Sequence, residues 1–97
     1  MPESKHLPYE GIRVVEFTHM VMGPTCGMVL ADMGATVVRI ESNARIDTAR
    51  TLQPFKDNTN SLESSALFSN MNAGKLGVTI NPTTPEGMAV IEDLIRW

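Results

Sequence analysis

The sequence predicts an α/β fold built on a parallel strand–helix–strand unit. Residues 12–17 (IRVVEF) and 36–41 (TVVRIE) are short runs rich in β-branched and apolar residues, which is typical of buried strands. Between them, residues 24–33 are apolar on nearly every side, with proline at the start and Gly34 directly after the end, where helices commonly begin and end. Two strands and a helix within about 30 residues match a parallel crossover.

The helix predicted over 24–33 carries a single charge, Asp32. A helix that is apolar on all sides is typically enclosed by other elements. We therefore expect this helix to be buried, with its larger apolar side chains inside the protein: Met28, Val29, Leu30 and Met33.

The second half of the sequence is less regular. Residues 42–62 are polar and show no periodicity, which predicts a long loop, and loops of this length usually cover a functional site or a partner. A short helix is expected over 63–71 and a third strand over 77–80.

The last predicted element is a helix that starts at Thr84-Pro85-Glu86. Threonine is a good N-cap, proline suits the first helical position, and a carboxylate in the first turn complements the helix dipole. An apolar stripe then continues to Trp97 without a helix-ending signal, so we expect the sequence to be cut from a longer domain.

Composition excludes several classes of protein. Ninety-seven residues make one small domain, and eight Lys and Arg among eleven Asp and Glu, with a net charge of −3, leave no basic surface for nucleic acid. Residues 1–10 are a polar lead-in without a signal-peptide pattern, and no apolar run is long enough to span a membrane, so a cytoplasmic location is expected. One cysteine and two histidines exclude an internal disulfide and a structural zinc site.

The turn after the first strand, residues 18–24 (THMVMGP), is the first candidate site. Open parallel sheets bind ligands at the carboxyl ends of their strands, where a helix N-terminus faces the ligand. A dinucleotide fingerprint is absent because only Gly23 and Gly27 are present, although Glu41 lies at the end of the second strand like a ribose-binding carboxylate. A nicotinamide-dependent oxidoreductase is therefore disfavoured.

Three further side chains have two interpretations each. His19 either contacts a ligand or makes a structural hydrogen bond, and the second is more frequent for a lone histidine. Cys26 near a helix start is either reactive or, as we favour, a small buried apolar residue. Lys75 is either a phosphate contact or, as we favour, a solvated loop lysine, since the surrounding residues do not form a phosphate-binding loop.

Two blocks of the sequence resemble class III CoA-transferases, a family that includes formyl-CoA transferase, carnitine CoA-transferase and α-methylacyl-CoA racemases. The first is GIRVVEFTHMVMGPTCGMVLADMGATVVRIE, with its strand, G-P helix start and L-A-D-x-G-A helix end. The second is NMNAGKLGVTINPTTPEG, and between the blocks Asp47 and Arg50 match G-D-x-x-R. The resemblance covers nearly the whole chain after Leu7.

This resemblance implies that residues 1–97 are the N-terminal part of a large Rossmann-like domain whose remainder is missing. In the family two chains interlock as a homodimer, and coenzyme A is a substrate rather than a permanently bound cofactor. The positions implied to contact coenzyme A are His19, Val21, Met22, Ser42, Ile80, Asn81, Pro82 and Thr83. Val21 replaces a family glutamine, Ser42 an arginine and Thr83 a lysine, which argues against formate or oxalate as the substrate.

The implied function is the movement of CoA between an acyl-CoA thioester and a carboxylic acid through an aspartyl intermediate. A carboxylate nucleophile divides the acyl transfer into two easier steps. The family's aspartate lies beyond residue 97 and does not match Asp32, Asp47 or Asp57, so these 97 residues are expected to be inactive alone. An α-methylacyl-CoA racemase and a catalytically inert α/β module remain alternatives.

Overall fold

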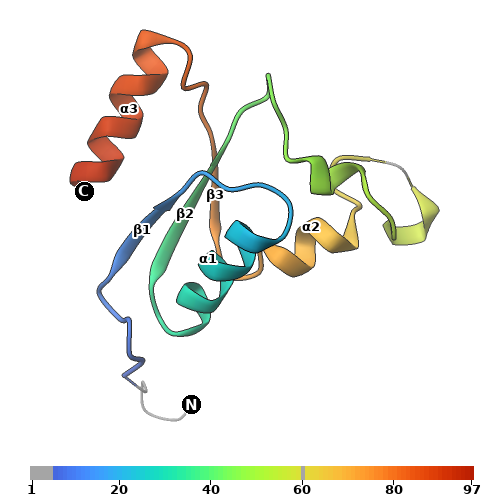
Figure 1. Ribbon diagram of the computed structural model, residues 1–97, viewed down its shortest axis with the longest axis horizontal. Helices are drawn as coiled ribbons and strands as arrows, with labels where there is room; N and C mark the ends of the chain where they lie inside the picture. Colours follow the sequence, from blue (N-terminus) through green and yellow to red (C-terminus); the bar gives the residue numbers. More distant parts are fainter. Residues whose placement is uncertain (1–5, 60) are drawn as a thin grey trace.

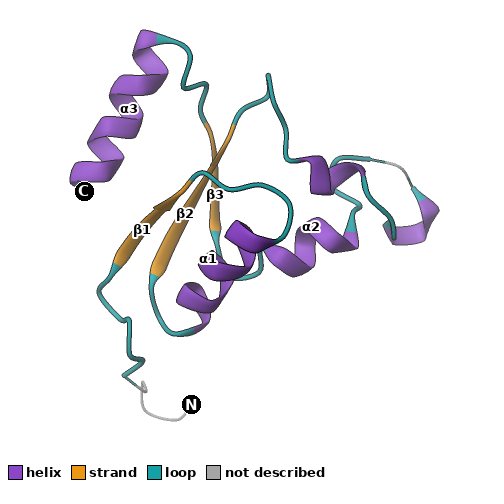
Figure 2. Ribbon diagram, viewed as in Figure 1, coloured by secondary structure: helices purple, strands orange, loops and turns teal. Residues whose placement is uncertain are grey.

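The computed structural model describes residues 6–59 and 61–97, which form a three-stranded parallel sheet with helices on both of its faces (Figure 1). The strands are β1 (Arg13–Glu16), β2 (Thr36–Glu41) and β3 (Leu76–Thr79), in the order β1-β2-β3. Helices α1 (Met22–Asp32) and α2 (Ala66–Met71) lie on one side of the sheet, and α3 (Pro85–Arg96) lies on the other (Figure 2).

The predicted strand–helix–strand unit is confirmed. Strand β1 pairs in parallel with β2, in a register that places Val15 opposite Val38, and α1 connects the two strands. The helix begins two residues earlier than the proline predicts and ends at Asp32, where Gly34 follows with a φ of +104°. That angle is in the left-handed region that glycine tolerates best, which is why the chain reverses there.

The start of α3 also agrees with the sequence. The hydroxyl of Thr84 accepts a hydrogen bond from the Gly87 amide over 3.0 Å, and Pro85 occupies the first turn. This cap is set by local sequence alone, which explains why the pattern predicted it. None of the helices in the described part of the chain is long and apolar enough to cross a membrane.

The two faces of the sheet have different chemistry. On the α3 side, Ile40 and Ile80 form the apolar core with Ile91 of the helix, and Val15 and Leu94 pack against it. Neighbouring side chains of a strand alternate between the two faces. The α1 side therefore receives Arg39 of β2, which is buried between Glu16 of β1 and the α2 residue Phe68.

The expectation that α1 is buried on all sides is wrong. Within the helix only Pro24 and Gly27 are buried, Met28 and Leu30 are half-buried, and Val29 is 46% exposed. Met33, directly after the helix, is 43% exposed. The reason is close packing by small residues, because a Cβ at Gly27 would lie 1.6 Å from the Glu16 carboxylate. The helix thus meets the sheet through a narrow strip, and its larger apolar side chains are half-buried or exposed.

Residues 42–62 are more ordered than the expected loop. Two short 3₁₀-helices interrupt the segment, η1 (Thr48–Thr51) and η2 (Lys56–Asn58). Asp47 caps η1 by accepting the Ala49 amide, and Ser65 at the start of α2 donates its hydroxyl hydrogen to the Ala49 carbonyl over 2.7 Å. Of this segment, η1 packs beside α2, and in Figure 1 the segment extends away from the sheet.

The contact at Gly27 gives a test in which two effects have opposite signs. Helix propensity alone predicts that Gly27→Ala stabilises the protein by about 0.5–1 kcal/mol. We expect instead a loss of about 1–3 kcal/mol in the free energy of unfolding, because the added methyl group collides with the buried Glu16 carboxylate.

Urea denaturation measures this difference, and Gly77→Ala is the matched control because a Cβ there meets no atom within 4 Å. Equal or greater stability of Gly27→Ala would contradict the packing described for α1.

Candidate functional site

A hollow of about 120 Å³ lies at the carboxyl ends of the parallel strands, and we call it the strand-end hollow. Four of the eight positions implied to contact coenzyme A are in its wall, and they come from three separate segments of the chain. The lining residues are Phe17, His19, Ile40, Glu41, Ser42, Arg45, Ile80 and Pro82.

The other four implied positions lie outside this wall. Val21 and Met22 are at the start of α1 and are 43% and 85% exposed. Asn81 and Thr83 belong to the turn before α3, where the Thr83 amide and hydroxyl both donate to the Asn81 side-chain oxygen. The structure therefore brings together His19, Ser42, Ile80 and Pro82, and leaves the remaining positions as neighbours in sequence.

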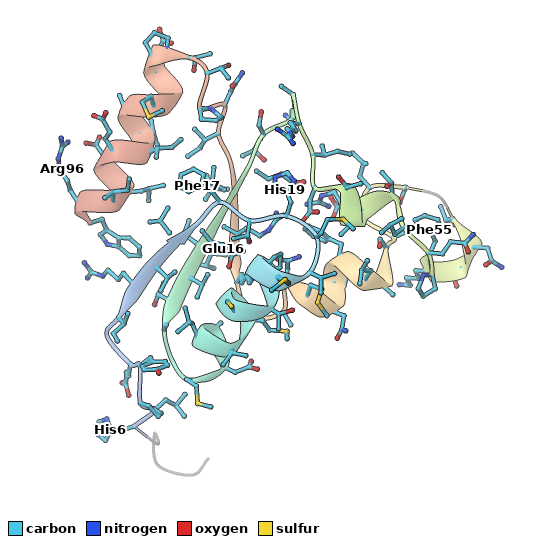
Figure 3. All side chains as sticks on the ribbon, viewed as in Figure 1. His6, Glu16, Phe17, His19, Phe55 and Arg96 are labelled. Carbon is cyan, nitrogen blue, oxygen red and sulfur yellow. The ribbon has the colours of Figure 1, made fainter. Side chains whose placement is uncertain are left out.

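The turn that carries His19 is held on both sides of that residue. The Thr18 carbonyl accepts a hydrogen bond from Arg39 Nη2 over 3.2 Å, and the Met20 amide donates to Asp47 Oδ1 over 3.0 Å. Met20 has a φ of +67°, an unusual angle for a residue with a side chain, and the bond to Asp47 stabilises it. The His19 side chain is exposed, and Figure 3 shows it near the strands and far from Phe55.

The groups that hold this turn belong to a buried ion cluster, which consists of Glu16, Arg39, Glu41, Asp47, Arg50 and Lys75. At its centre Arg39 pairs with Asp47, and their side chains are 4% and 0% exposed. Arg39 also contacts Glu41 over 3.3 Å and Glu16 over 3.8 Å. Buried charges are costly unless they are paired, and here three carboxylates surround one guanidinium. Among the described residues, Arg39 Nε and Glu16 Oε1 are nevertheless buried without a hydrogen-bond partner.

Glu41 is the carboxylate that links the cluster to the strand-end hollow. Its two oxygens accept hydrogen bonds from Arg50 over 2.8 and 2.9 Å, and one of them also accepts from the Asp47 amide over 2.7 Å. Burial on its own raises the pKa of Glu41, but the Arg50 and Asp47 hydrogen bonds and the charges of Arg50 and Arg39 outweigh it and lower the pKa to about 2. Glu41 is therefore ionised and fully engaged, so although it lies at the end of β2 it is not free to bind a ribose.

Phe68 of α2 closes one side of the cluster. The Arg50 guanidinium lies 3.7 Å from the centre of its ring and that of Arg39 lies 5.0 Å away. Glu41 also strengthens the charged form of Arg50 and raises its pKa. An aromatic face over two paired cations adds attraction while excluding water.

The interpretation of Lys75 as a solvated loop residue is wrong. Its side chain is 2% exposed, and Nζ donates to Glu16 Oε2 over 2.8 Å, the Pro24 carbonyl over 2.8 Å and the Asn72 side chain over 2.9 Å. These three acceptors satisfy all three ammonium hydrogens, so Lys75 has none left for a phosphate.

Cys26 also differs from the expectation, because its side chain is exposed on α1 rather than buried. The close approach of α1 to the sheet uses Gly27, the next residue along, and turns Cys26 towards the outer side. His6, the second histidine, contacts Glu10 over 3.3 Å at the N-terminal end of the chain, far from His19 (Figure 3).

A second hollow, of about 280 Å³, lies on the α2 side of the sheet. Its charged walls include Arg39, Arg50 and Lys75. Gly77 of β3 lies opposite Arg39 of β2, and because glycine has no side chain it leaves space for the hollow. All three cations there are paired with carboxylates of the cluster, so this larger space offers an incoming anion little charge.

The strand-end hollow is suited to binding rather than to covalent chemistry. Glu41 is the one carboxylate among its lining residues, and both of its oxygens are occupied. Asp47 is buried against Arg39, while Asp32 and Asp57 are exposed on other elements. What remains available in the wall is an imidazole, a guanidinium and apolar surface.

Sequence reasoning missed three residues of the hollow: Phe17, Ile40 and Arg45. Ile40 was predicted only as a strand residue, and it also belongs to the apolar core. Phe17 was assigned to a buried strand but follows the last residue of β1 and is 51% exposed. Arg45 lies in a polar segment without periodicity, so no pattern singled it out. The sequence feature that could have identified Arg45 is its position three residues after Ser42, a spacing that fits a tight turn bringing the two residues together.

The depressed pKa of Glu41 predicts a pH dependence of stability. A carboxyl whose pKa is lower in the folded state stabilises the fold above its unfolded pKa of about 4.5, and the contribution is lost as the pH falls towards 2. We expect Glu41→Gln to lower the melting temperature at pH 6 and to have a much smaller effect near pH 2.

Thermal melts of the unaltered protein and of Glu41→Gln between pH 2 and 7 measure this difference. Glu63→Gln is the control, because Glu63 pairs with the same Arg50 but is 87% exposed. A difference that is independent of pH would contradict the Glu41 assignment.

Comparisons with known proteins agree with this arrangement. The model of CoA-transferase family III matches residues 9–97. Over 98 aligned residues the chain is 37% identical to succinate–glutarate CoA-transferase of Agrobacterium fabrum, and over 87 residues it is 34% identical to formyl-CoA:oxalate CoA-transferase of a Bradyrhizobium species. These alignments cover 99% and 90% of the chain but 24% and 20% of the relatives, so the chain spans less than a quarter of their length.

Solved structures give the same result. A CAIB/BAIF family protein from Brucella suis superimposes with a TM-score of 0.81 at 35% identity, over 94% of this chain and 24% of that one. A hypothetical protein from Mycobacterium tuberculosis superimposes with a TM-score of 0.74 at 33% identity, over 91% of this chain and 22% of that one. The parallel sheet, the order of its elements and the matched sequence therefore have one explanation: the chain belongs to CoA-transferase family III.

Proposed function

We propose that this chain is the N-terminal part of the large domain of a CoA-transferase and that it supplies part of the coenzyme A site. The observation that carries the proposal is the strand-end hollow, where folding assembles His19, Ser42, Ile80 and Pro82 from three separate segments. The family resemblance implies these same residues as coenzyme A contacts. Ligands of open parallel sheets bind at this end of the strands.

The chemistry of the hollow fits part of coenzyme A. Apolar walls from Phe17, Ile40, Ile80 and Pro82 suit an extended organic arm, and the His19 imidazole offers a hydrogen bond near it. A drug-sized ligand normally occupies about 300–1,000 Å³. A hollow of about 120 Å³ therefore holds only a portion of the molecule, with the remainder contacted by other segments. Val21, Met22, Asn81 and Thr83 are proposed to make outer contacts beside it.

In the proposed reaction, CoA moves between an acyl-CoA thioester and a carboxylic acid through an aspartyl intermediate. The family resemblance implies that the aspartate nucleophile belongs to a segment after residue 97, and the pairing of Asp47 and Glu41 with arginines supports this assignment. The complete protein is proposed to act as an interlocked homodimer in the cytoplasm. The role of residues 1–97 is to bind and orient CoA, while the covalent step belongs elsewhere.

A two-part experiment tests this division of roles. Residues 1–97 are expected to give no isotope exchange above background between labelled CoA and a panel of acyl-CoA thioesters, because they lack the nucleophile. In thermal melts with millimolar CoA the same chain is expected to gain stability, since a ligand that binds only the folded state raises the melting temperature. His19→Ala is expected to reduce that gain while leaving the melting temperature without ligand nearly unchanged.

The two parts have separate contradictory outcomes. Robust exchange by residues 1–97 would place the chemistry within this chain and not beyond it. A melting temperature that does not change when CoA is added would contradict the assignment of the strand-end hollow as part of the coenzyme A site. Loss of stability in His19→Ala without ligand would make the histidine a structural residue.

A further inference from the structure

Arg45 lines the strand-end hollow, and neither the fold nor the proposed function gives its side chain a role. It ends a tight turn that follows β2, in which Ser42 and Arg45 form an antiparallel bridge and the Arg45 amide donates to the Ser42 carbonyl over 3.2 Å. The Ser42 hydroxyl accepts the Ala44 amide over 3.1 Å and closes the turn. Ser42 is therefore engaged in shaping the turn, and Arg45 is the residue that the turn presents to the hollow.

The charge of Arg45 differs from that of the other cations near the strand ends. Arg39, Arg50 and Lys75 are all paired with buried carboxylates. Within the described residues, the Arg45 side chain makes no hydrogen bond or ion pair. Glu41 shares the wall of the hollow, but Arg50, Arg39 and the Asp47 amide already occupy its oxygens. Arg45 is also an exposed residue, so its guanidinium is available to an anion.

We propose that Arg45 is a phosphate-binding residue of the coenzyme A site, an inference that rests on the proposed function. Coenzyme A combines a neutral pantetheine arm with a phosphorylated adenosine end. The apolar wall and His19 suit the arm, and a guanidinium, whose planar fork binds phosphate oxygens in pairs, suits the charged end. Arg45 therefore makes the site selective for phosphorylated ligands over pantetheine alone.

The experiment compares coenzyme A with pantetheine, which lacks every phosphate. Dissociation constants are measured by isothermal titration calorimetry on residues 1–97 and on three variants. In Arg45→Ala the dissociation constant for CoA is expected to rise about tenfold while that for pantetheine stays unchanged, because only a charged contact is lost. Lys56→Ala removes one positive charge from the exposed η2 and is expected to leave both constants unchanged, which controls for net charge.

A rescue variant separates ligand binding from a structural role. Ser42 lines the same hollow and bridges Arg45, so the double variant Arg45→Ala with Ser42→Arg returns a guanidinium to the site. It is expected to recover most of the lost CoA affinity. A residue that only maintains the turn would not be rescued in this way.

Each other result overturns the proposal. Equal CoA affinity of Arg45→Ala and the unaltered chain would show that Arg45 does not contact phosphate, while the proposed CoA site would stand. Equal loss of CoA and pantetheine affinity would make Arg45 a structural residue. Failure of the unaltered chain to bind either ligand would overturn the proposed function, and the role of Arg45 with it.

Discussion

The buried pair of Arg39 and Asp47 is the interaction on which the rest of this structure depends. A guanidinium in the central strand of a sheet is stable only if carboxylates and carbonyls surround it. Asp47 arrives from the segment after β2, Glu16 from β1, and the Thr18 carbonyl from the first turn. Satisfying one charge therefore joins β1 and the turn after it to β2 and the segment after β2.

The same pair determines the shape of the candidate site. Asp47 holds the Met20 amide, and Arg39 holds the Thr18 carbonyl, so the backbone on both sides of His19 is fixed from beneath. Glu41, two residues after Arg39, binds Arg50, and this ion pair attaches η1 to the end of β2. The α1 side of the sheet is stabilised by buried ion pairs, while the α3 side is stabilised by an apolar core. The strand-end hollow lies where these two kinds of packing meet, with Glu41 and Ile40 both in its wall.

Local patterns predicted the parts of the fold that local chemistry determines. The β-branched runs became β1 and β2, and the Thr84-Pro85 cap became the start of α3. The burial of Lys75 was not predictable in this way, because its partner Glu16 lies 59 residues earlier and neither sequence neighbourhood indicates the other. The outward position of Cys26 depends in turn on the contact between Gly27 and Glu16, which is also tertiary. The site residues were accessible to sequence reasoning through family resemblance, whereas Arg45 required the geometry of a turn.

The central claim is that coenzyme A lies in the strand-end hollow and not in the larger hollow beside α2. Backbone amide chemical shifts of isotopically labelled protein, recorded while CoA is added, locate the ligand directly even when binding is weak. The account predicts that the largest shifts occur at the amides of His19, Ser42 and Ile80. Largest shifts at Phe68, Asn72 and Lys75 would place the ligand in the other hollow and contradict the account.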